Sequence, residues 1–381
     1  MHVAILIPSL RPGGAERAML NLGRGLAERG IAIDLVLGKA WGPYLHDVPS
    51  TIRVVELGTE SVLFSLPNLV LYLRHERPDA LISALDHQNV SAILAKKLAG
   101  VSTRLIVTVH TVVSRSARGL GGLRNRIIPL LARISYPSAD VVIAVSQGVA
   151  ADLRYVIGLR QVNVTIIHNA IVTPEISVLA RAPLSDPWFS PDGPPIVLSA
   201  GRLAPPKDFQ TLIRAFDIVR RHTPARLVIL GEGEARGELE DLIGRLELSG
   251  LAKLAGFVDN PYAFMARSSV FVLSSRWEGL PSVLIESLAC GTPVVATMAS
   301  SGPAEILADG LYGRLVPVGN QEALARAISE TLRTPSDVES LKKRASFFAL
   351  DRISEQYLAV LRIGQVPKSN NSIASRDGSN R

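Results

Sequence analysis

The sequence predicts an α/β protein built from two doubly wound, Rossmann-like domains that face each other across a cleft. Three observations support this fold class. With 381 residues, the chain is longer than one ordinary hydrophobic core allows. Short β-branched runs alternate with helix-length segments, which is typical of a parallel sheet covered by helices on both faces. The alternation stops at a stretch rich in Pro, Ser and Asp, residues 173–195, and then begins again.

The first predicted domain covers residues 1–172. Its opening apolar run has no basic segment and no small-residue cleavage site, so we expect a buried strand there rather than a signal peptide. In the segment that follows, Ala18, Leu22 and Leu26 recur at helical spacing. Further strands are predicted at the runs IAIDLVLG, IRVVELG, ALISAL, RLIVTVH and VVIAVS.

The second predicted domain covers residues 196–347, after a linker at 173–195. Its strands are predicted at PIVLSAGR, ARLVILGEGE, LAKLAGF, VFVLSS and PVVAT. A last helix within residues 348–365 is expected to cross back and pack on the first domain. Residues 366–381 are polar and rich in Ser and Asn, and we expect them to be disordered. Doubly wound sheets bind ligands at the carboxyl ends of their strands, so the expected site is a cleft between the domains.

Composition narrows the class of protein further. Hydrophobic residues make up 47% and charged residues 20% of the chain, as in a globular protein. The single cysteine, Cys290, excludes a disulfide framework and favours a reducing compartment. No apolar stretch is long enough to cross a bilayer. We therefore expect a cytoplasmic protein, either free or peripheral on the inner face of the cell membrane.

The net charge of +7 is unevenly distributed. The segment 96–133 contains no acidic residue, and part of it alternates arginine with Leu and Ile, a combination that suits anionic lipid headgroups. A solvated helix face is the alternative. Nucleic acid is disfavoured, because the segment has no interleaved aromatic residues and matches no common binding module. The cations are Lys96, Lys97, Arg104, Arg115, Arg118, Arg124, Arg126 and Arg133.

Two carboxylates, Glu278 and Glu286, stand in the segment RWEGLPSVLIESLACGTPVV. Pro281 suits the start of a helix, where free backbone N–H groups can bind phosphate or sugar oxygens. The residues three and four positions from Glu286 include no base, so a partly buried carboxylate there needs hydrogen bonds from outside its helix. Vicinal ribose hydroxyls would provide them. A pair of surface glutamates is the alternative.

Further candidates follow other predicted strands. In GRLAPPKDFQTL, Arg202 and Lys207 could hold a diphosphate and stabilise it as a leaving group, although surface cations are common. Gly13 and Gly14 allow a close approach of the backbone to a ligand. His110 ends a strand and could donate a hydrogen bond to a substrate hydroxyl. The alternative is a structural histidine whose hydrogen bonds are satisfied within the protein. No G-x-G-x-x-G fingerprint follows the first strand, and the GEGE turn at residues 231–234 does not complete one, which disfavours a dehydrogenase.

Taken together, these motifs resemble the retaining glycosyltransferases of family 4, also called glycosyl transferases group 1, which have the GT-B fold. The resemblance extends to about residue 363, and its most specific part is the E-x7-E motif from Glu278 to Glu286. It implies that Glu286 holds the ribose and Glu278 the donor sugar, and that Arg202 and Lys207 grip the diphosphate. Close relatives often have Arg where Ala304 stands.

The resemblance also implies the remaining site residues. Gly13 and Gly14 would close over the diphosphate, and His110 would lie near the donor sugar. No metal and no cofactor are expected. Backbone groups would line the pocket for sugar and diphosphate at Gly279, Leu280, Pro281 and Ser282, and the base would face Phe257 and Val258.

The predicted function is transfer, with retention, of a hexose or N-acetylhexosamine from a nucleotide sugar, with UDP as the expected carrier. A saccharide, expected to be lipid-linked, would accept the sugar during assembly of lipopolysaccharide or another cell-surface polysaccharide. An anionic membrane surface is a further expected partner. The alternatives are a sugar-nucleotide epimerase of the same fold and a non-catalytic nucleotide-binding protein.

Overall fold

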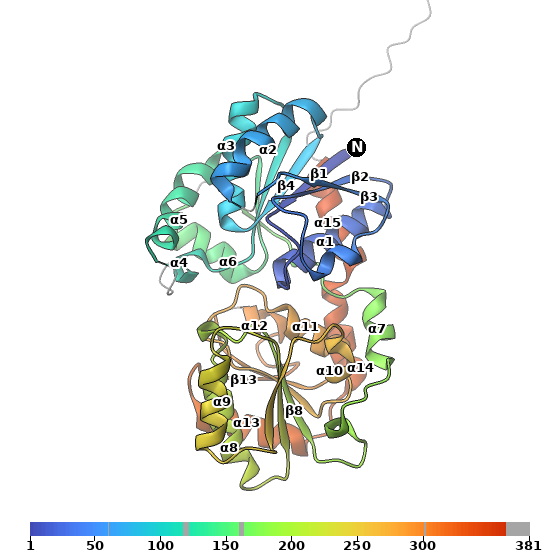
Figure 1. Cartoon of the computed structure of the whole chain (residues 1–381), viewed down its shortest axis with the longest axis vertical. Coiled ribbons are helices and arrows are strands. Elements are labelled where there is room, and N and C mark those ends of the chain that lie inside the picture. Colours follow the sequence, from blue (N-terminus) through green and yellow to red (C-terminus); the bar gives the residue numbers. More distant parts are fainter. Residues whose placement is uncertain (60, 117–121, 160–163, 301, 363–381) are drawn as a thin grey trace, which may run out of the picture.

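The computed structural model describes residues 1–59, 61–116, 122–159, 164–300 and 302–362. It contains two parallel sheets, one in each half of the chain (Figure 1). The first sheet has seven strands in the order β3-β2-β1-β4-β5-β6-β7. These strands are β1 (His2–Ile7), β2 (Ala32–Leu37), β3 (Ile52–Glu56), β4 (Ala80–Ala84), β5 (Arg104–Val109), β6 (Val141–Ala144) and β7 (Val164–Ile166).

The second sheet has six strands in the order β10-β9-β8-β11-β12-β13. Both orders reverse direction beside the first strand of the sheet, as in doubly wound folds. The expected fold class, GT-B with two Rossmann-like halves, is therefore confirmed. The strands are β8 (Ile196–Ala200), β9 (Arg226–Leu230), β10 (Ala252–Gly256), β11 (Val270–Leu273), β12 (Val294–Thr297) and β13 (Arg314–Val316).

Helices connect the strands and cover the sheets (Figure 1). The first half contains α1 (Gly14–Ala27), α2 (Val62–Glu76), α3 (Asp86–Ala99), α4 (Val113–Ser116), α5 (Gly122–Ser135) and α6 (Gln147–Ala151). The second half contains α8 (Phe209–Arg220), α9 (Arg236–Arg245), α10 (Pro261–Met265), α11 (Ser282–Ala289), α12 (Gly302–Ile306), α13 (Gln321–Arg333) and α14 (Val338–Ala345). Among the described residues, no helix is both long and apolar enough to span a bilayer.

The strands are apolar along their length because both faces of each sheet are covered. On β1, Ala4 and Leu6 belong to one core cluster, whereas Val3, Ile5 and Ile7 belong to another. Successive side chains of a strand point to opposite faces, so a strand buried on both sides needs a continuous apolar run. This is the pattern that the sequence shows.

The last helix, α15 (Leu350–Arg362), returns to the first half and lies beside α1, as expected (Figure 1). Ile353 and Tyr357 are buried in the core cluster that also holds Leu22 of α1. At the point of return, Val172 and Ala349 form a parallel bridge. The two chain segments that connect the halves therefore run side by side.

The expected linker contains regular structure. Helix α7 (Pro174–Arg181) begins with Pro174 at its first turn, and its Ile176 is buried. Asp186 forms an ion pair of 2.6 Å with Lys253, which ties the segment to β10. The expected domain boundaries remain predictions. The tail 366–381 and Arg118 lie outside the described residues.

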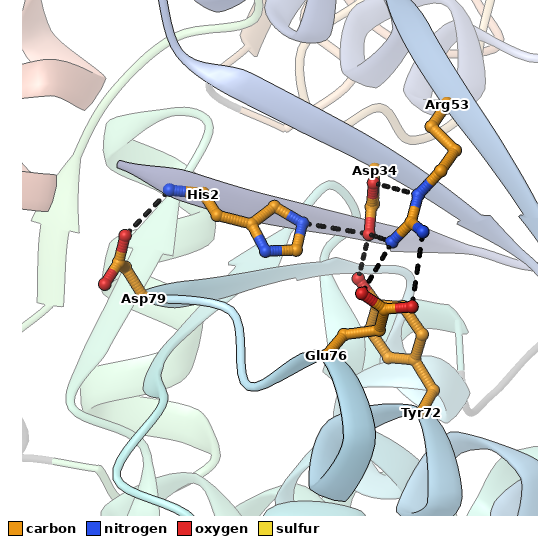
Figure 2. Close-up of polar contacts among 6 residues, drawn as sticks. All are labelled: His2, Asp34, Arg53, Tyr72, Glu76 and Asp79. Carbon is orange, nitrogen blue, oxygen red and sulfur yellow. Dashed lines mark hydrogen bonds and ion pairs between the residues drawn. The ribbon is translucent and has the colours of Figure 1, made fainter.

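A polar network joins the amino ends of the first three strands, on the edge of the sheet away from the inter-domain contacts (Figure 2). Asp34 is 3% exposed and accepts hydrogen bonds from Arg53 at 2.8 Å and from the Tyr72 hydroxyl at 2.6 Å. His2 Nε2 lies 2.9 Å from the same carboxylate. Burial alone would raise the pKa of Asp34, but these hydrogen bonds outweigh burial and leave the pKa below its ordinary value.

We expect Asp34→Asn to lower the free energy of unfolding by about 2 kcal/mol at pH 7, because Tyr72 loses its charged partner and Arg53 keeps only its ion pair with Glu76. A carboxyl with a depressed pKa contributes stability above its unfolded pKa of about 4, and loses this contribution as pH falls through the folded pKa. The difference between wild type and variant should therefore shrink below about pH 4 in urea melts. Asp351→Asn, at a surface ion pair with Arg29, is the control and should change little. An equal difference at pH 3 and pH 7 would contradict the role of the Asp34 charge.

Candidate functional site

The two halves meet at the carboxyl ends of their strands, around residues 279–282. Ser146, after β6, donates a hydrogen bond of 3.0 Å to the carbonyl oxygen of Gly279. A Cβ atom built on Gly14 would lie 3.1 Å from the hydroxyl oxygen of Ser282. The glycine loop of the first half therefore lies directly against the start of α11, so the sequence candidates from both halves come together.

Glu278 lies between β11 and α11 and is bound by two side chains. Lys207 Nζ is 2.6 Å from Glu278 Oε1, and the Ser275 hydroxyl donates to the same oxygen at 2.6 Å. Pro281 occupies the residue just before α11, one position earlier than its expected place as the first helical residue. The carboxylate and the ammonium group are thus fixed beside the first turn of α11.

The turn that carries Lys207 is held by several contacts. It forms a short helix, η5 (Pro205–Lys207), followed by Asp208 in the left-handed conformation with φ of 49°. The Ser274 hydroxyl donates to the Lys207 carbonyl oxygen at 2.8 Å, and Arg276 pairs with Asp208 at 3.1 Å. Arg202 is exposed and makes no ion pair with the residues that the structure describes. Its guanidinium group remains open to an anionic ligand.

Glu286 is 7% exposed on α11. As expected, its partner comes from outside its own helix, because the Tyr262 hydroxyl donates to Glu286 Oε1 at 3.5 Å. Burial raises the pKa of Glu286, and the charge of Arg17 together with the Tyr262 hydrogen bond partly offsets the rise. The alternative of a pair of surface glutamates is wrong, since Glu278 also has a side chain only 14% exposed.

His110 follows β5 and is 8% exposed. Its Nε2 lies 3.0 Å from the Thr108 hydroxyl oxygen, and that hydroxyl donates its own proton to the Ser83 carbonyl. Nε2 must therefore carry the proton that Thr108 accepts, which leaves Nδ1 as an acceptor. Burial lowers the pKa of His110 to about 4, and contact with Asn169 offsets part of this effect. The imidazole is thus neutral at pH 7 and can accept, but not donate, a hydrogen bond through Nδ1.

The remaining sequence candidates follow β9 and β10, the two strands at one edge of the second sheet. Phe257 follows β10 and is 46% exposed, and Val258 is partly buried beside it. The GEGE turn packs on the turn after β8, because a Cβ atom on Gly233 would lie 2.4 Å from the Leu203 carbonyl oxygen. Close packing therefore explains the glycine at position 233 of that turn. No three His, Cys, Asp or Glu side chains of the described ranges are grouped to hold a metal ion.

Several residues of the site were not identified from the sequence. Arg17 and Tyr262 join the two halves beside Glu286. Glu305 forms a second link, since it accepts from the Gln147 backbone N–H at 2.8 Å and lies 2.7 Å from His168 Nε2. Glu305 belongs to the GPAEIL motif, which provided a signal, whereas nothing local in the sequence indicated Arg17 or Tyr262.

We expect Gly279→Ala to reduce turnover at least tenfold, because there is no room for a side chain. A Cβ atom at this position would lie 2.0 Å from the carbonyl oxygen of His110. The halves would have to separate, which would displace the candidate site residues of one half from those of the other. Steady-state kinetics and a thermal melt test this, with Gly237→Ala on α9, where a Cβ atom meets nothing within 4 Å, as the control. Unchanged turnover in Gly279→Ala would show that this contact is not needed.

Comparisons with known proteins identify the family of this chain. Residues 12–174 match the family described as Glycosyltransferase Family 4, and residues 181–347 match the family described as Glycosyl transferases group 1. A relative in Campylobacter jejuni is 32% identical over 90% of this chain and 93% of its own length. Its name is N-acetylgalactosamine-N,N'-diacetylbacillosaminyl-diphospho-undecaprenol 4-alpha-N-acetylgalactosaminyltransferase.

Two further proteins extend the comparison. The lipopolysaccharide core biosynthesis glycosyltransferase LpsE of Rhizobium meliloti is 30% identical over 92% of this chain and 96% of its own. Among solved structures, Anabaena HepE in complex with UDP and glucose superposes with a TM-score of 0.77. It is 22% identical, and the match covers 95% of this chain and all of HepE, so this likeness concerns the fold.

Proposed function

This chain belongs to glycosyltransferase family 4, and on that premise we propose that it transfers a hexose or N-acetylhexosamine from a UDP-sugar, with retention of configuration. The observation that carries the proposal is the ion pair of 2.6 Å between Lys207 and Glu278 at the start of α11. This pair brings together a cation that would bind the diphosphate and an acid that would bind the sugar hydroxyls. UDP is proposed as the carrier because HepE, which shares the fold, is described in complex with UDP.

The donor is proposed to lie between the glycine loop and α11. Arg202, Lys207 and the free N–H groups at the start of α11 would bind the diphosphate, and Glu286 the ribose hydroxyls. Glu278 would hold the donor sugar, and His110 Nδ1 would accept a hydrogen bond from one of its hydroxyls. Phe257 and Val258 would face the base, and the backbone of residues 279–282 would line the sugar pocket.

The proposed chemistry is a displacement on one face of the sugar. The bond from the anomeric carbon to the diphosphate oxygen breaks, and a bond from the same carbon to the acceptor oxygen forms on the same face. The acceptor proton passes to an oxygen of the departing diphosphate. Lys207 and Arg202 stabilise the charge that develops on the diphosphate, and Glu278 faces the positive charge that develops on the sugar ring.

Binding and product analysis test this proposal. UDP, GDP and ADP sugars are screened by thermal shift, and tight binding of UDP-sugars alone is expected to raise the melting temperature by mass action. The anomeric configuration of the product, read by NMR, should equal that of the donor. An inverted product would contradict retention, and a changed sugar without any acceptor would indicate an epimerase.

The acceptor is proposed to be a lipid-linked saccharide of lipopolysaccharide or another cell-surface polysaccharide. The Campylobacter relative is named for a diphospho-undecaprenol acceptor, and the Rhizobium relative for the lipopolysaccharide core. Such an acceptor would be reached by an enzyme that is peripheral on the inner face of the cell membrane. The acceptor saccharide would enter the cleft from the first half.

The surface of α3 and α5 supports a position on the membrane surface. These helices pack on each other and expose large apolar side chains beside the cations Lys97 and Arg133. Lys96, another cation of the segment, pairs with Asp140 at 2.5 Å. Basic and apolar side chains together suit anionic lipid. The exposed apolar residues are Leu94, Leu98, Ile127, Leu130, Leu131 and Ile134.

Flotation with vesicles tests the membrane surface. We expect the protein to float with vesicles that contain anionic lipid and not with neutral vesicles. Charge reversal of Arg124 and Arg126 should weaken flotation, whereas reversal of Lys342 and Lys343 on the second half should not. Unchanged flotation after reversal of Arg124 and Arg126 would contradict a role for this segment.

A further inference from the structure

Arg17 of α1 reaches from the first half to the acid of the second half that is proposed to bind ribose. Its Nη1 donates a hydrogen bond of 2.9 Å to the Tyr262 hydroxyl. The Tyr262 hydroxyl in turn donates to Glu286 Oε1 at 3.5 Å. A cation, a phenol and a carboxylate thus form one chain across the cleft, which we name the Arg17 relay: Arg17, Tyr262 and Glu286.

The relay is fixed from the first half as well. The Arg17 guanidinium group lies 4.3 Å from the centre of the Tyr44 ring, in η1 (Pro43–Asp47), and its Nη2 lies 3.8 Å from Asp47 Oδ2. The cation is therefore stacked on an aromatic ring and held by an acid. These contacts direct Arg17 toward the second half rather than into solvent.

Ionisable groups from both halves interact with the Glu286 carboxylate. Arg17 from α1 and Tyr262 from α10 lower the pKa of Glu286, and burial raises it more. The Glu286 charge also acts on Tyr44 of η1. Burial raises the pKa of the Cys290 thiol, just after α11, to about 12, and the Glu286 charge adds to this rise. Arg17 is thus the cation that offsets the burial of Glu286.

We propose that Arg17 is a positioning residue, which acts through Tyr262 to keep Glu286 charged, so that Glu286 accepts hydrogen bonds from both ribose hydroxyls of the donor. The inference rests on the proposed function. A charged carboxylate accepts at two oxygens, and Tyr262 occupies only Oε1. A protonated acid would need to donate at one oxygen and would hold a diol less well.

The relay also links donor binding to the approach of the two halves. Glu286 lies on α11, but the cation that supports it lies on α1. Separation of the halves would withdraw Arg17 and leave a buried carboxylate with a less favourable environment. Ribose should therefore bind best when the halves are in contact.

Calorimetric titration against pH tests the inference. The probe is the nucleoside diphosphate, among UDP, GDP and ADP, that binds wild type most tightly, and titrations run upward from the ordinary pKa range of a glutamate, about pH 4, to about pH 8. Affinity should fall as pH drops through the pKa of Glu286. In Arg17→Met the loss of a favourable charge raises that pKa, so the midpoint should move up by about one pH unit, which is tenfold in affinity on the acidic side.

Four further measurements make the result specific. Tyr262→Phe should move the midpoint in the same direction by less, and Arg17→Lys should restore most of the wild-type profile. Arg326→Met removes the same charge from an exposed position on α13 of the second half and should leave the profile unchanged. The 2′-deoxy form of the same nucleotide should bind more weakly to wild type and lose most of the dependence on Arg17.

The outcomes separate the two hypotheses. If none of the three diphosphates binds wild type, the proposed function fails and the inference with it. If one binds, and folded Arg17→Met has the wild-type midpoint, the inference alone is overturned. Circular dichroism checks folding. If Arg17→Met does not fold, an unmoved midpoint in Tyr262→Phe overturns the inference, and a raised one supports it.

Discussion

Lys207→Ala is expected to lower turnover by about 10² to 10³-fold, because it removes the cation closest to the proposed leaving group. UDP affinity should fall as well, since Lys207 would contact the diphosphate in the ground state. The melting temperature should drop by only about 2 °C, because a partly exposed ion pair contributes about 1 kcal/mol to stability. Radiolabelled sugar transfer, UDP titration and thermal melts measure these quantities.

Lys343→Ala provides the control for Lys207→Ala, because Lys343 is exposed on α14 of the same half. It removes an equal charge and should leave transfer unchanged. Wild-type transfer rates in Lys207→Ala would remove the leaving-group role. A large drop in melting temperature would instead indicate that Lys207 is mainly structural.

Glu278→Gln is expected to lower turnover by about 10²-fold while UDP affinity does not fall. The amide keeps the size of the side chain and an acceptor for Ser275, but it loses the charge that is proposed to face the sugar ring. Lys207 also loses its ion pair and becomes fully available to the diphosphate. The two variants should therefore differ in the direction of their effect on UDP affinity.

A double-mutant cycle strengthens the test of Glu278. If Lys207 and Glu278 act on opposite ends of one breaking bond, their effects on turnover should not simply add. Glu339→Gln, whose side chain is 85% exposed on α14, is the control. Loss of UDP affinity in Glu278→Gln, equal to that in Lys207→Ala, would contradict separate roles for the acid and the cation.

Most of the fold could be predicted because most of its strands and helices have recognisable local sequence patterns. Continuous apolar runs such as those of β1 and β8 are buried on both faces, so they stand out without knowledge of their neighbours. Strands β7 and β13 were missed, since each has only three residues and no apolar run of useful length. Helix α7 was missed because its segment is dominated by the turn residues around it.

The candidate site was predicted in part for the same reason. Lys207, Glu278 and His110 follow predicted strands, and parallel strands place their carboxyl ends together. The link from Arg17 to Tyr262 joins residues 245 positions apart, so no local pattern could indicate it. The direction of the hydrogen bond at His110 depends on the Ser83 carbonyl, which a sequence motif does not contain.

The bridge between Val172 and Ala349 has a practical consequence for protein engineering. A fragment that ends at residue 172 would lack α15, and so would expose the apolar side of α1 that Ile353 and Tyr357 now cover. Such a fragment should aggregate unless residues 349–362 are supplied as a separate peptide or grafted by a short tether. Permuted chains that keep α15 joined to the first half are the better starting point for exchanging this half between enzymes.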